Sequence, residues 1–289
     1  MVPRSTVIMH SHHSHSGQFC QHAKGPVEAS IAQAIKLGFK VFCLTEHMPR
    51  LDPSYLYQEE IESNTSCKDL ENTFAAYHDY ARSLQGKYPE IKLIVGFEAE
   101  GYPEALDYAA SFLPKFDFVV GSLHHVAGIP IDMSIAQWNL IAEKLGGVEQ
   151  VFEAYFDQQL EMLKALKPQV VGHFDLIRLF SPTQEFSENI WAKIERNIQY
   201  AVSLGCLFEI NTAAIRKGWN VPYPKPDVAD RIHANAGTFC LSDDSHQAGQ
   251  VGQHYHEIIE YVEKYGPVKA VDGSEVGIEE YKQWVARHY

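Results

Sequence analysis

The sequence predicts an α/β fold and, within that class, a (β/α) barrel. Short apolar segments of strand length alternate with segments of helical periodicity along the chain, which favours parallel strands joined by crossover helices. A polar residue, in most cases one able to bind a metal, follows each apolar segment at once, and functional groups at many strand ends are typical of a barrel. The length of 289 residues suits one such unit, so we expect a single domain over residues 1–289.

A doubly wound open sheet is the structural alternative. Such a sheet collects its ligand-binding residues at one switch point in the strand order. The polar residues here follow all seven expected strands, which favours the barrel.

Seven strands are expected from runs of apolar and β-branched residues. They span residues 7–9, 40–44, 91–95, 116–120, 170–171, 206–210 and 238–241.

Helical periodicity with start and stop residues predicts the connecting segments. Pro26 in the first turn and Gly38 as a stop define a helix over 26–37, and Gly146-Gly147 breaks a long helical stretch in two. The other expected helices are 70–88, 103–112, 134–166 with that break, 189–204, 226–236, 255–265 and 275–288. Residues 48–67 are polar and irregular, so we expect a long loop that acts as a lid or specificity segment.

Composition excludes several classes of function. A net charge of −13 argues against general nucleic-acid binding, which needs a basic surface. No apolar run approaches the ~20 residues of a membrane span, and the N-terminus lacks the apolar core of a secretory signal. The five cysteines are scattered without a CxxC motif, so we expect a reducing, cytoplasmic location and no structural disulfide. Nothing in the sequence indicates an oligomeric state.

A histidine cluster follows the first expected strand. Five imidazoles lie between His10 and His22, and residues two apart on a strand face the same side. His10 therefore pairs with His12, and His13 with His15, each pair forming half a shell for a divalent transition metal. A purification tag would be a contiguous histidine run and would not normally follow an apolar strand.

Further histidines and carboxylates lie at or just past the other strand ends. A single such histidine is more often a hydrogen-bonded core or surface residue than a ligand. Scattered histidines have no reason to follow strand ends, however, so the joint pattern indicates a metal centre. The candidate ligands are His13, His15, His22, His47, Glu98, His124, His173, Asp244 and His246.

The order of these motifs resembles the PHP (polymerase and histidinol phosphatase) superfamily. The motifs are His-x-His at 13–15, Thr-Glu-His at 45–47, Gly-x-Glu at 96–98, Gly-Ser-x-His at 121–124, Gly-His-x-Asp at 172–175 and Asp-x-His at 244–246. The motifs around 121–125, 172–178 and 208–212 resemble the histidinol-phosphatase branch, and the doubled opening is similar to fungal members.

This resemblance implies a distorted, TIM-like (β/α)7 barrel that holds two or three divalent metals. It places His13, His15, Glu98 and Asp244 on one metal, Glu98, His124 and His173 on a second, and His22, His47 and His246 on a third. One carboxylate can bridge two cations ~3.5–4 Å apart. Zinc, manganese and iron all accept mixed histidine and carboxylate ligands.

Three positions have a neighbouring competitor in the sequence. His10 and His12 compete with His13 and His15, and we favour the later pair because the segment after it resembles the family's continuation. His125 competes with His124. Asp243 competes with Asp244, where the Asp-x-His spacing favours Asp244.

The resemblance further implies hydrolysis of a small phosphorylated substrate, histidinol phosphate, to histidinol and phosphate in histidine biosynthesis. We expect a metal-bridging hydroxide to attack phosphorus directly, with Asp244 or His246 protonating the leaving alkoxide. Another small phosphomonoester, a PHP-type nuclease and a non-catalytic metal-binding barrel are the competing hypotheses.

Substrate contacts are expected from residues close to the strand-end motifs. Arginine matches phosphate with a bidentate fork, and Arg178, Arg216 and, less favoured, Arg50 are the candidates; each could instead pair with a surface acid. Glu46, Glu100 and Asp175 could receive the ammonium and imidazole of histidinol, or could instead orient ligand histidines. Tyr57 or Tyr223 could stack on the imidazole ring.

Overall fold

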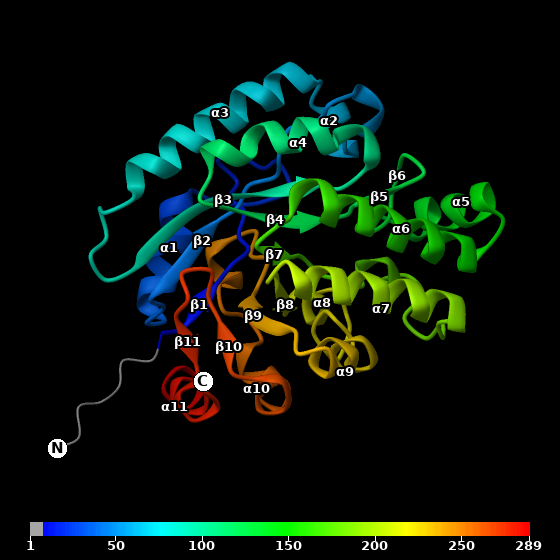
Figure 1. The fold of residues 1–289 in the computed structure, drawn as a ribbon. Coiled ribbons are helices and arrows are strands. Elements are labelled where there is room, and N and C mark those ends of the chain that lie inside the picture. The colour runs from blue at the N-terminus through cyan, green and yellow to red at the C-terminus, as the bar shows by residue number, and fades with distance from the viewer. Residues whose placement is uncertain (1–7) are drawn as a thin grey trace.

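Seven parallel strands form the centre of the molecule (Figure 1). This computed structural model describes residues 8–289. The strands are β1 His10–Ser11, β2 Val41–Leu44, β3 Lys92–Glu100, β4 Phe118–Ser122, β7 Val170–Val171, β8 Leu207–Asn211 and β9 Thr238–Ser242. Neighbours in the sheet follow the order of the chain, β1-β2-β3-β4-β7-β8-β9, without a reversal. A doubly wound sheet requires such a reversal, so the open-sheet alternative is excluded.

The first and last strands meet and almost close the barrel. The amide of His12 donates to the carbonyl of Leu241 at 3.1 Å, and Ser14 forms a parallel bridge with Ser245 just beyond the strands. A barrel of this kind leaves no free edge between β1 and β9. The structure is therefore the expected α/β barrel, nearly closed and seven-stranded.

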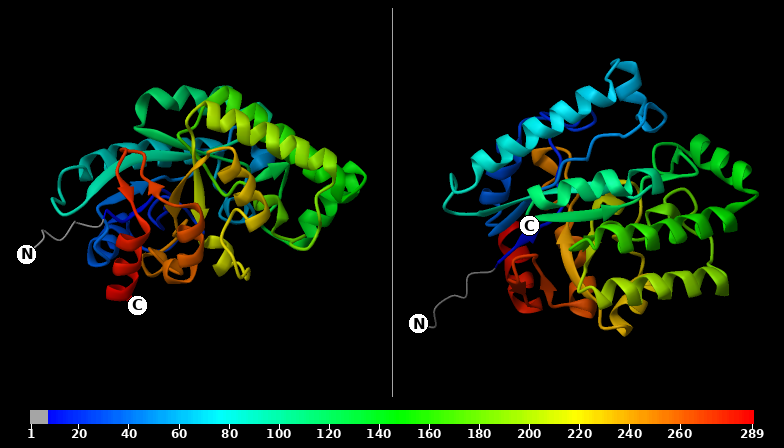
Figure 2. Two further views of the ribbon diagram at one scale, coloured as in Figure 1. Left: turned by 60° about the horizontal axis from the view of Figure 1, so that its bottom comes forward. Right: turned by 45° about the horizontal axis from the view of Figure 1, so that its top comes forward.

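The connecting helices lie outside the strands (Figures 1 and 2). They are α1 Val27–Lys36, α2 Gln58–Glu62, α3 Cys67–Leu84, α4 Leu106–Phe112, α5 Ile135–Leu145, α6 Val148–Leu166, α7 Glu188–Ser203, α8 Ala213–Arg216, α9 Pro226–Ala234, α10 Ile259–Tyr265 and α11 Ile278–His288. Two small hairpins are added, β5 His125–Val126 with β6 Ile129–Pro130, and β10 Val268–Lys269 with β11 Glu275–Val276.

Some boundaries differ from those expected from the sequence. Residue 7 of the expected first strand lies outside the described residues, and strand pairing begins at His10. Helix α3 begins at Cys67 rather than at residue 70, because Ser66 and Asp69 form a reciprocal capping box. The expected loop over 48–67 contains a turn of 3-10 helix at Pro53–Tyr55 and the short helix α2, so it is not irregular throughout.

The strand side chains divide into two sets because a strand alternates its faces. The outward set packs against the helices and forms the larger core. The inward set begins with a small apolar layer that includes Val41, Cys43, Ile94, Phe118, Val120, Val170 and Cys240. Gly96 is required beside this layer, because a Cβ there would lie 2.4 Å from the Phe118 ring. Further along each strand, the same inward alternation reaches polar residues such as Glu98, Glu209 and Asp244.

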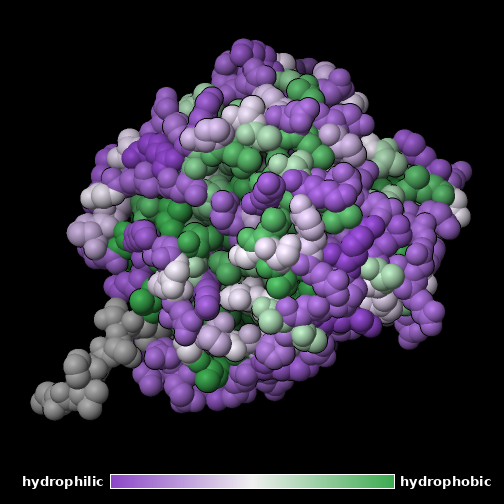
Figure 3. All heavy atoms as spheres, viewed as in Figure 1, coloured by the Kyte–Doolittle hydropathy of each residue, from purple (hydrophilic) through white to green (hydrophobic). Residues whose placement is uncertain are grey.

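The outer surface is mainly polar. Figure 3 shows hydrophilic residues over much of one face, with hydrophobic ones interspersed mostly toward its middle. Within residues 8–289, no helix combines the length and the apolar composition needed to cross a bilayer.

Candidate metal centre

Glu98 lies at the middle of the candidate site. It lies on β3, its side chain points into the barrel, and the residue is only 1% exposed. Its carboxylate oxygens face five imidazoles from four other segments of the chain. The closest nitrogen–oxygen distances are 3.1 Å to His13 and His173, 3.3 Å to His124, 2.8 Å to His47 and 3.5 Å to His15.

Asp244 approaches the same group from the far side of the barrel seam. Its Oδ1 atom lies 3.7 Å from His13 Nε2 and 3.4 Å from His15 Nε2, and the two rings lie 5.1 Å apart. The loops that carry these residues are joined by the bridge between Ser14 and Ser245. The meeting of β1 and β9 therefore assembles a set of two imidazoles and two carboxylates.

A second set combines Glu98 with His124 and His173. The Nε2 atoms of the two histidines lie 3.3 Å apart, and all three ligand atoms fall within 4.8 Å of one another. His124 follows β4 and His173 follows β7, which are neighbouring strands. Their carboxyl ends meet at one edge, as parallel pairing requires.

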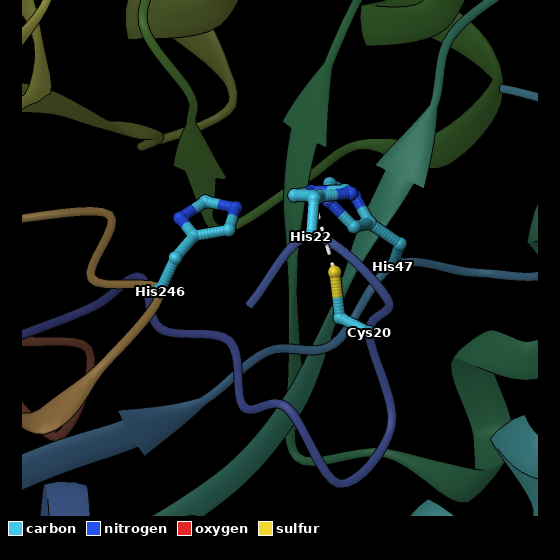
Figure 4. A group of neighbouring side chains, drawn as sticks. All are labelled: Cys20, His22, His47 and His246. Atoms are coloured by element: carbon cyan, nitrogen blue, oxygen red, sulfur yellow. Dashed lines mark hydrogen bonds between the residues drawn. The ribbon is translucent and has the colours of Figure 1, made fainter. Parts of the chain in front are cut away.

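A third set lies nearer the solvent and includes a residue that the sequence did not single out. His22, His47 and His246 have ligand atoms within 4.8 Å of one another, and the Sγ atom of Cys20 belongs to the same group. Figure 4 shows the His22 and His47 rings close together, with Cys20 below them and His246 approaching from another segment.

These groups fit divalent metal ions. Within the described residues, Nε2 of His13 and both ring nitrogens of His15 are buried without a hydrogen-bond partner, although such atoms normally have one. Carboxylates behind the rings contact the other nitrogens: Glu209 Oε1 lies 3.0 Å from His13 Nδ1, and Glu100 Oε1 lies 3.1 Å from His124 Nδ1. A carboxylate behind a ligating histidine fixes the tautomer that turns a lone pair toward a metal.

Electrostatics keep the central carboxylates ionised. Burial alone would raise the pKa of Glu98, but the imidazoles of His13, His124 and His47 outweigh burial and hold that pKa well below its ordinary value. Burial opposes ionisation of Asp244 in the same way, and His13 and His15 likewise hold its pKa well below the ordinary value. Both carboxylates are thus available to a cation at neutral pH.

His10 and His12 lie beside the inward apolar layer, among backbone groups: His10 pairs in register with Val41, and the His12 ring lies 6.3 Å from the Phe118 ring. The Leu241 amide donates to His10 Nε2 at 3.2 Å, and the Val271 amide donates to His12 Nε2 at 3.0 Å. His12 Nδ1 lies 3.1 Å from the Leu241 carbonyl. Backbone groups already contact the nitrogens of these two rings, so His10 and His12 do not join the cluster around Glu98.

The position of His12 predicts acid sensitivity. Burial lowers its pKa from 6.5 to about 4, so the folded state resists protonation and His12 contributes stability above pH 6.5 that is lost as pH falls toward 4. This pKa difference corresponds to at most about 3 kcal/mol in the free energy of unfolding. In urea unfolding of metal-free protein across this pH range, His12→Gln should show a shallower loss of stability than wild type. His78→Gln on helix α3 is the control, and equal slopes for all three proteins would contradict the prediction.

Asp243 and His125, the competitors of Asp244 and His124, also lie away from the cluster around Glu98. Asp243 accepts hydrogen bonds from the amides of Ser245 and Gly252, so its carboxylate supports the loop after β9. The ring of His125 stacks on Tyr57 with centroids 5.6 Å apart, away from Glu98. Asp244 and His124 are the members of these pairs that reach the cluster.

A cavity of about 390 Å³ opens over the cluster. Arg216 and Lys217, from the end of α8, line its wall beside Asp132 and the histidines. Arg216 donates to the carbonyl of Asp244 at 2.6 Å, and its Nη1 atom is buried without a partner. Lys217 donates to Asp132 at 3.1 Å. Because Lys217 pairs with Asp132, the net positive charge of this wall above the carboxylates comes from Arg216.

Two other arginines pair with carboxylates elsewhere, which differs from the sequence expectation. Nη1 of Arg178 donates to both carboxylate oxygens of Asp227, at 2.8 and 3.0 Å, and Arg178 does not line the cavity. Arg50 is buried against Glu100 and lies over the Tyr57 ring. Neither arginine lines this cavity, so neither is placed to contact a phosphate in it.

The three carboxylates expected to contact the ammonium or imidazole of the substrate instead contact other groups of the protein. Glu46 accepts from the amide and hydroxyl of Ser16, and Asp175 accepts from the Lys225 amide. Glu100 lies behind His124 and outside the cavity lining. Of the two candidate aromatic residues, Tyr57 lines the cavity and Tyr223 does not.

Sequence reasoning missed Glu209, Lys217 and Asp132. Glu209 had a usable signal, because a charged residue inside an apolar strand is costly to bury unless it has a partner. Here the partners are His13 and the amide of His173. Asp132 follows the hairpin strand β6, which is not one of the seven barrel strands, and Lys217 follows the short helix α8, so neither directly follows a barrel strand.

Comparison with known proteins agrees with this geometry. The PHP domain family matches residues 11–213. A Schizosaccharomyces pombe protein named "Probable histidinol-phosphatase" is 43% identical over 266 residues, covering 89% of this chain and 86% of that protein. The Saccharomyces cerevisiae protein named "Histidinol-phosphatase" is 34% identical over 295 residues, covering 88% of each chain.

Two solved structures share the fold. A crystal structure of a Listeria monocytogenes protein aligns with a TM-score of 0.74 at 24% identity, covering 86% of this chain and 98% of that one. Histidinol phosphate phosphatase from Lactococcus lactis, complexed with Zn, L-histidinol and phosphate, aligns with a TM-score of 0.61 at 18% identity, covering 90% of this chain and 94% of that one. By its family match over most of its length and its close fungal relatives, the chain belongs to the PHP domain family.

Proposed function

We propose that this protein is a metal-dependent histidinol-phosphatase that hydrolyses histidinol phosphate to histidinol and phosphate. The observation that carries the proposal is the cavity in which a cationic wall, Arg216 and Lys217, faces a buried histidine and carboxylate cluster. Fungal relatives named for this activity cover nearly the whole chain, which supports the choice of substrate.

The proposed centre holds two or three divalent ions on the three sets described above. Glu98, with oxygens facing separate imidazoles, would bridge two of them. Zinc is our first choice, because the mixed set of histidine and carboxylate ligands suits it and the Lactococcus lactis structure contains it. When bound, such ions supply activated water and positive charge for phosphoryl transfer.

The chain's own residues would bind and orient the ester. Arg216 offers its buried, unpartnered Nη1 to a phosphoryl oxygen, and Lys217 adds a second charge beside it. Asp132 is the carboxylate of the cavity that lies outside the histidine cluster, so it would receive the ammonium group of the substrate. Tyr57 provides an aromatic wall for the imidazole ring.

The leaving alkoxide requires a proton, and two residues are in position to deliver it. His246 lies at the rim of the cavity, and burial lowers its pKa to about 3, which leaves the ring neutral at neutral pH. Its Nδ1 atom contacts the Asp244 carbonyl at 2.9 Å, so Nε2 is the ring nitrogen available to the cavity. Because both residues are unprotonated at neutral pH, we assign Asp244 or His246 to accept the proton that the attacking water loses and to pass it to the leaving alkoxide.

Phosphate release from histidinol phosphate tests the proposal. It should be compared with release from p-nitrophenyl phosphate and with cleavage of a short single-stranded oligonucleotide. We expect a strong preference for histidinol phosphate that chelation abolishes. Equal turnover of both monoesters would retain a phosphatase but reject the named substrate. Oligonucleotide cleavage alone would move the assignment to a nuclease.

Arg216 and Arg178 provide a matched pair of variants. Arg216→Met should lower kcat/KM for histidinol phosphate by roughly 10²-fold, the usual effect of removing one preorganised donor to a developing charge. Arg178→Met should lower the Tm, because it leaves Asp227 and the buried Asp175 unpaired, but should change kcat/KM less than about tenfold below the transition. Comparable losses of kcat/KM in both variants would reject the placement of the phosphate beside Arg216.

A further inference from the structure

We propose that Cys20 is a thiolate ligand of the outermost metal, completing the set formed by His22, His47 and His246. This inference rests on the proposed metal centre and adds a fourth, sulfur-containing ligand to it. Cys20 is buried, 8% exposed, and lies two residues before His22 on the segment that follows the histidine cluster.

The distances match a tetrahedral site. The Sγ atom of Cys20 lies 3.3 Å from His22 Nε2, and His22 Nε2 lies 3.4 Å from His47 Nε2. Zinc bonds of ~2.0–2.1 Å to nitrogen and ~2.3 Å to sulfur place tetrahedral ligands ~3.3–3.4 Å apart for two nitrogens and ~3.6 Å for nitrogen and sulfur. The four ligand atoms, one from each residue, all lie within 4.8 Å of one another. In Figure 4, the sulfur points toward the His22 and His47 rings.

The contacts of His22 point to a cation. Its Nδ1 atom lies 2.9 Å from Glu59 Oε1, so this carboxylate orients the ring. Its Nε2 atom faces both the Cys20 sulfur, at 3.3 Å, and His47 Nε2, at 3.4 Å. A metal between these atoms would satisfy all of them at once. On binding, the thiol proton leaves to solvent and the sulfur lone pair forms the new bond.

His15 joins this set to the deeper one. It is 2% exposed, and its Nε2 atom faces Asp244 at 3.4 Å and Glu98 at 3.5 Å in the deeper set. Its ring lies 4.1 Å from the His47 ring and 4.5 Å from the His246 ring, measured between centroids. The set that contains Cys20 therefore packs directly against candidate metal ligands rather than against the apolar core.

The segment that carries Cys20 is held in place by its own turns. The Cys20 amide donates to the Ser16 carbonyl at 2.9 Å, and the Lys24 amide donates to the His246 carbonyl at 2.7 Å. Gly17 permits this close folding, because a Cβ there would lie 2.7 Å from the Lys24 Cα atom. The backbone therefore joins the segment of Cys20 and His22 directly to that of His246 and positions the sulfur before any metal arrives.

Cobalt substitution tests the sulfur ligand directly. Metal-stripped full-length protein is loaded with Co²⁺, and the near-ultraviolet thiolate-to-cobalt charge-transfer band is recorded together with the bound cobalt content. We expect the band in wild type, its complete loss in Cys20→Ser and Cys20→Ala, and its retention in Cys67→Ser. Cys67 begins helix α3 and lies outside the metal-binding groups, so it is the matched control.

The outcomes separate this inference from the proposed function. Cobalt bound without a charge-transfer band in wild type, or with the same band in Cys20→Ser, would reject the Cys20 ligand and leave the metal centre standing. A wild-type protein that binds no cobalt would reject the metal centre, and the Cys20 ligand with it. Circular dichroism of the Cys20 variants confirms that loss of the band does not reflect unfolding.

Discussion

Glu98→Gln is expected to lower kcat/KM for histidinol phosphate by about a thousandfold or more. Glu98 faces five imidazoles, and an amide has no charge to hold two cations together. Loss of one metal's electrostatic contribution, several kcal/mol, corresponds to roughly 10³-fold in rate. Steady-state kinetics with added zinc, together with elemental analysis of the purified variant, measure both effects.

The control for this substitution lies on the outer surface. Glu161→Gln changes an exposed glutamate of helix α6 that pairs only with Lys164, so its activity and metal content should equal those of wild type. If Glu98→Gln kept both its metal and activity within tenfold of wild type, Glu98 would not be the bridging ligand.

Removal of the metals should abolish activity and lower stability. Chelator-treated protein is expected to lose phosphatase activity to background and to regain it on addition of zinc. The Tm should also fall, because a ligand present at 1,000 times its Kd stabilises the folded state by about 4 kcal/mol, or roughly 10 °C in Tm. Differential scanning calorimetry with and without chelator measures the shift.

The chelation experiment is repeated on the Glu98→Gln variant for comparison with wild type. Its Tm should respond less to chelator than that of wild type, because it begins with less bound metal. Full activity after exhaustive chelation, with metal content below the enzyme concentration, would show that the metals serve stability alone and would reject the proposed chemistry.

The elements of the barrel could largely be predicted because their signals are local. The strand at 238–241 and its following Asp-x-His motif, for example, lie within nine residues of each other. Strand length, apolar content and the polar residue at the carboxyl end all act over such short distances. Since parallel strands align their carboxyl ends, these motifs indicated one common site before any packing was known.

The choice between neighbouring residues required the packed structure. His10-Ser11-His12 and His13-Ser14-His15 are similar sequences, but the first pair binds backbone groups of residues 241 and 271, more than 200 positions away. Arg178 and Arg216 likewise follow similar motifs. The first pairs with Asp227 outside the cavity lining, whereas the second lines the cavity with an unpartnered Nη1.

By itself, the sequence determined the (β/α) class, the positions of the strands and the type of chemistry, because periodicity and ligand type are properties of short segments. The tertiary structure alone decided which imidazoles share a carboxylate, which arginine faces the cavity, and that Lys217 lines it. The physical reason is the closure of the barrel: bringing β1 beside β9 determines which side chains have partners across the seam, and a one-dimensional pattern contains no record of those distances.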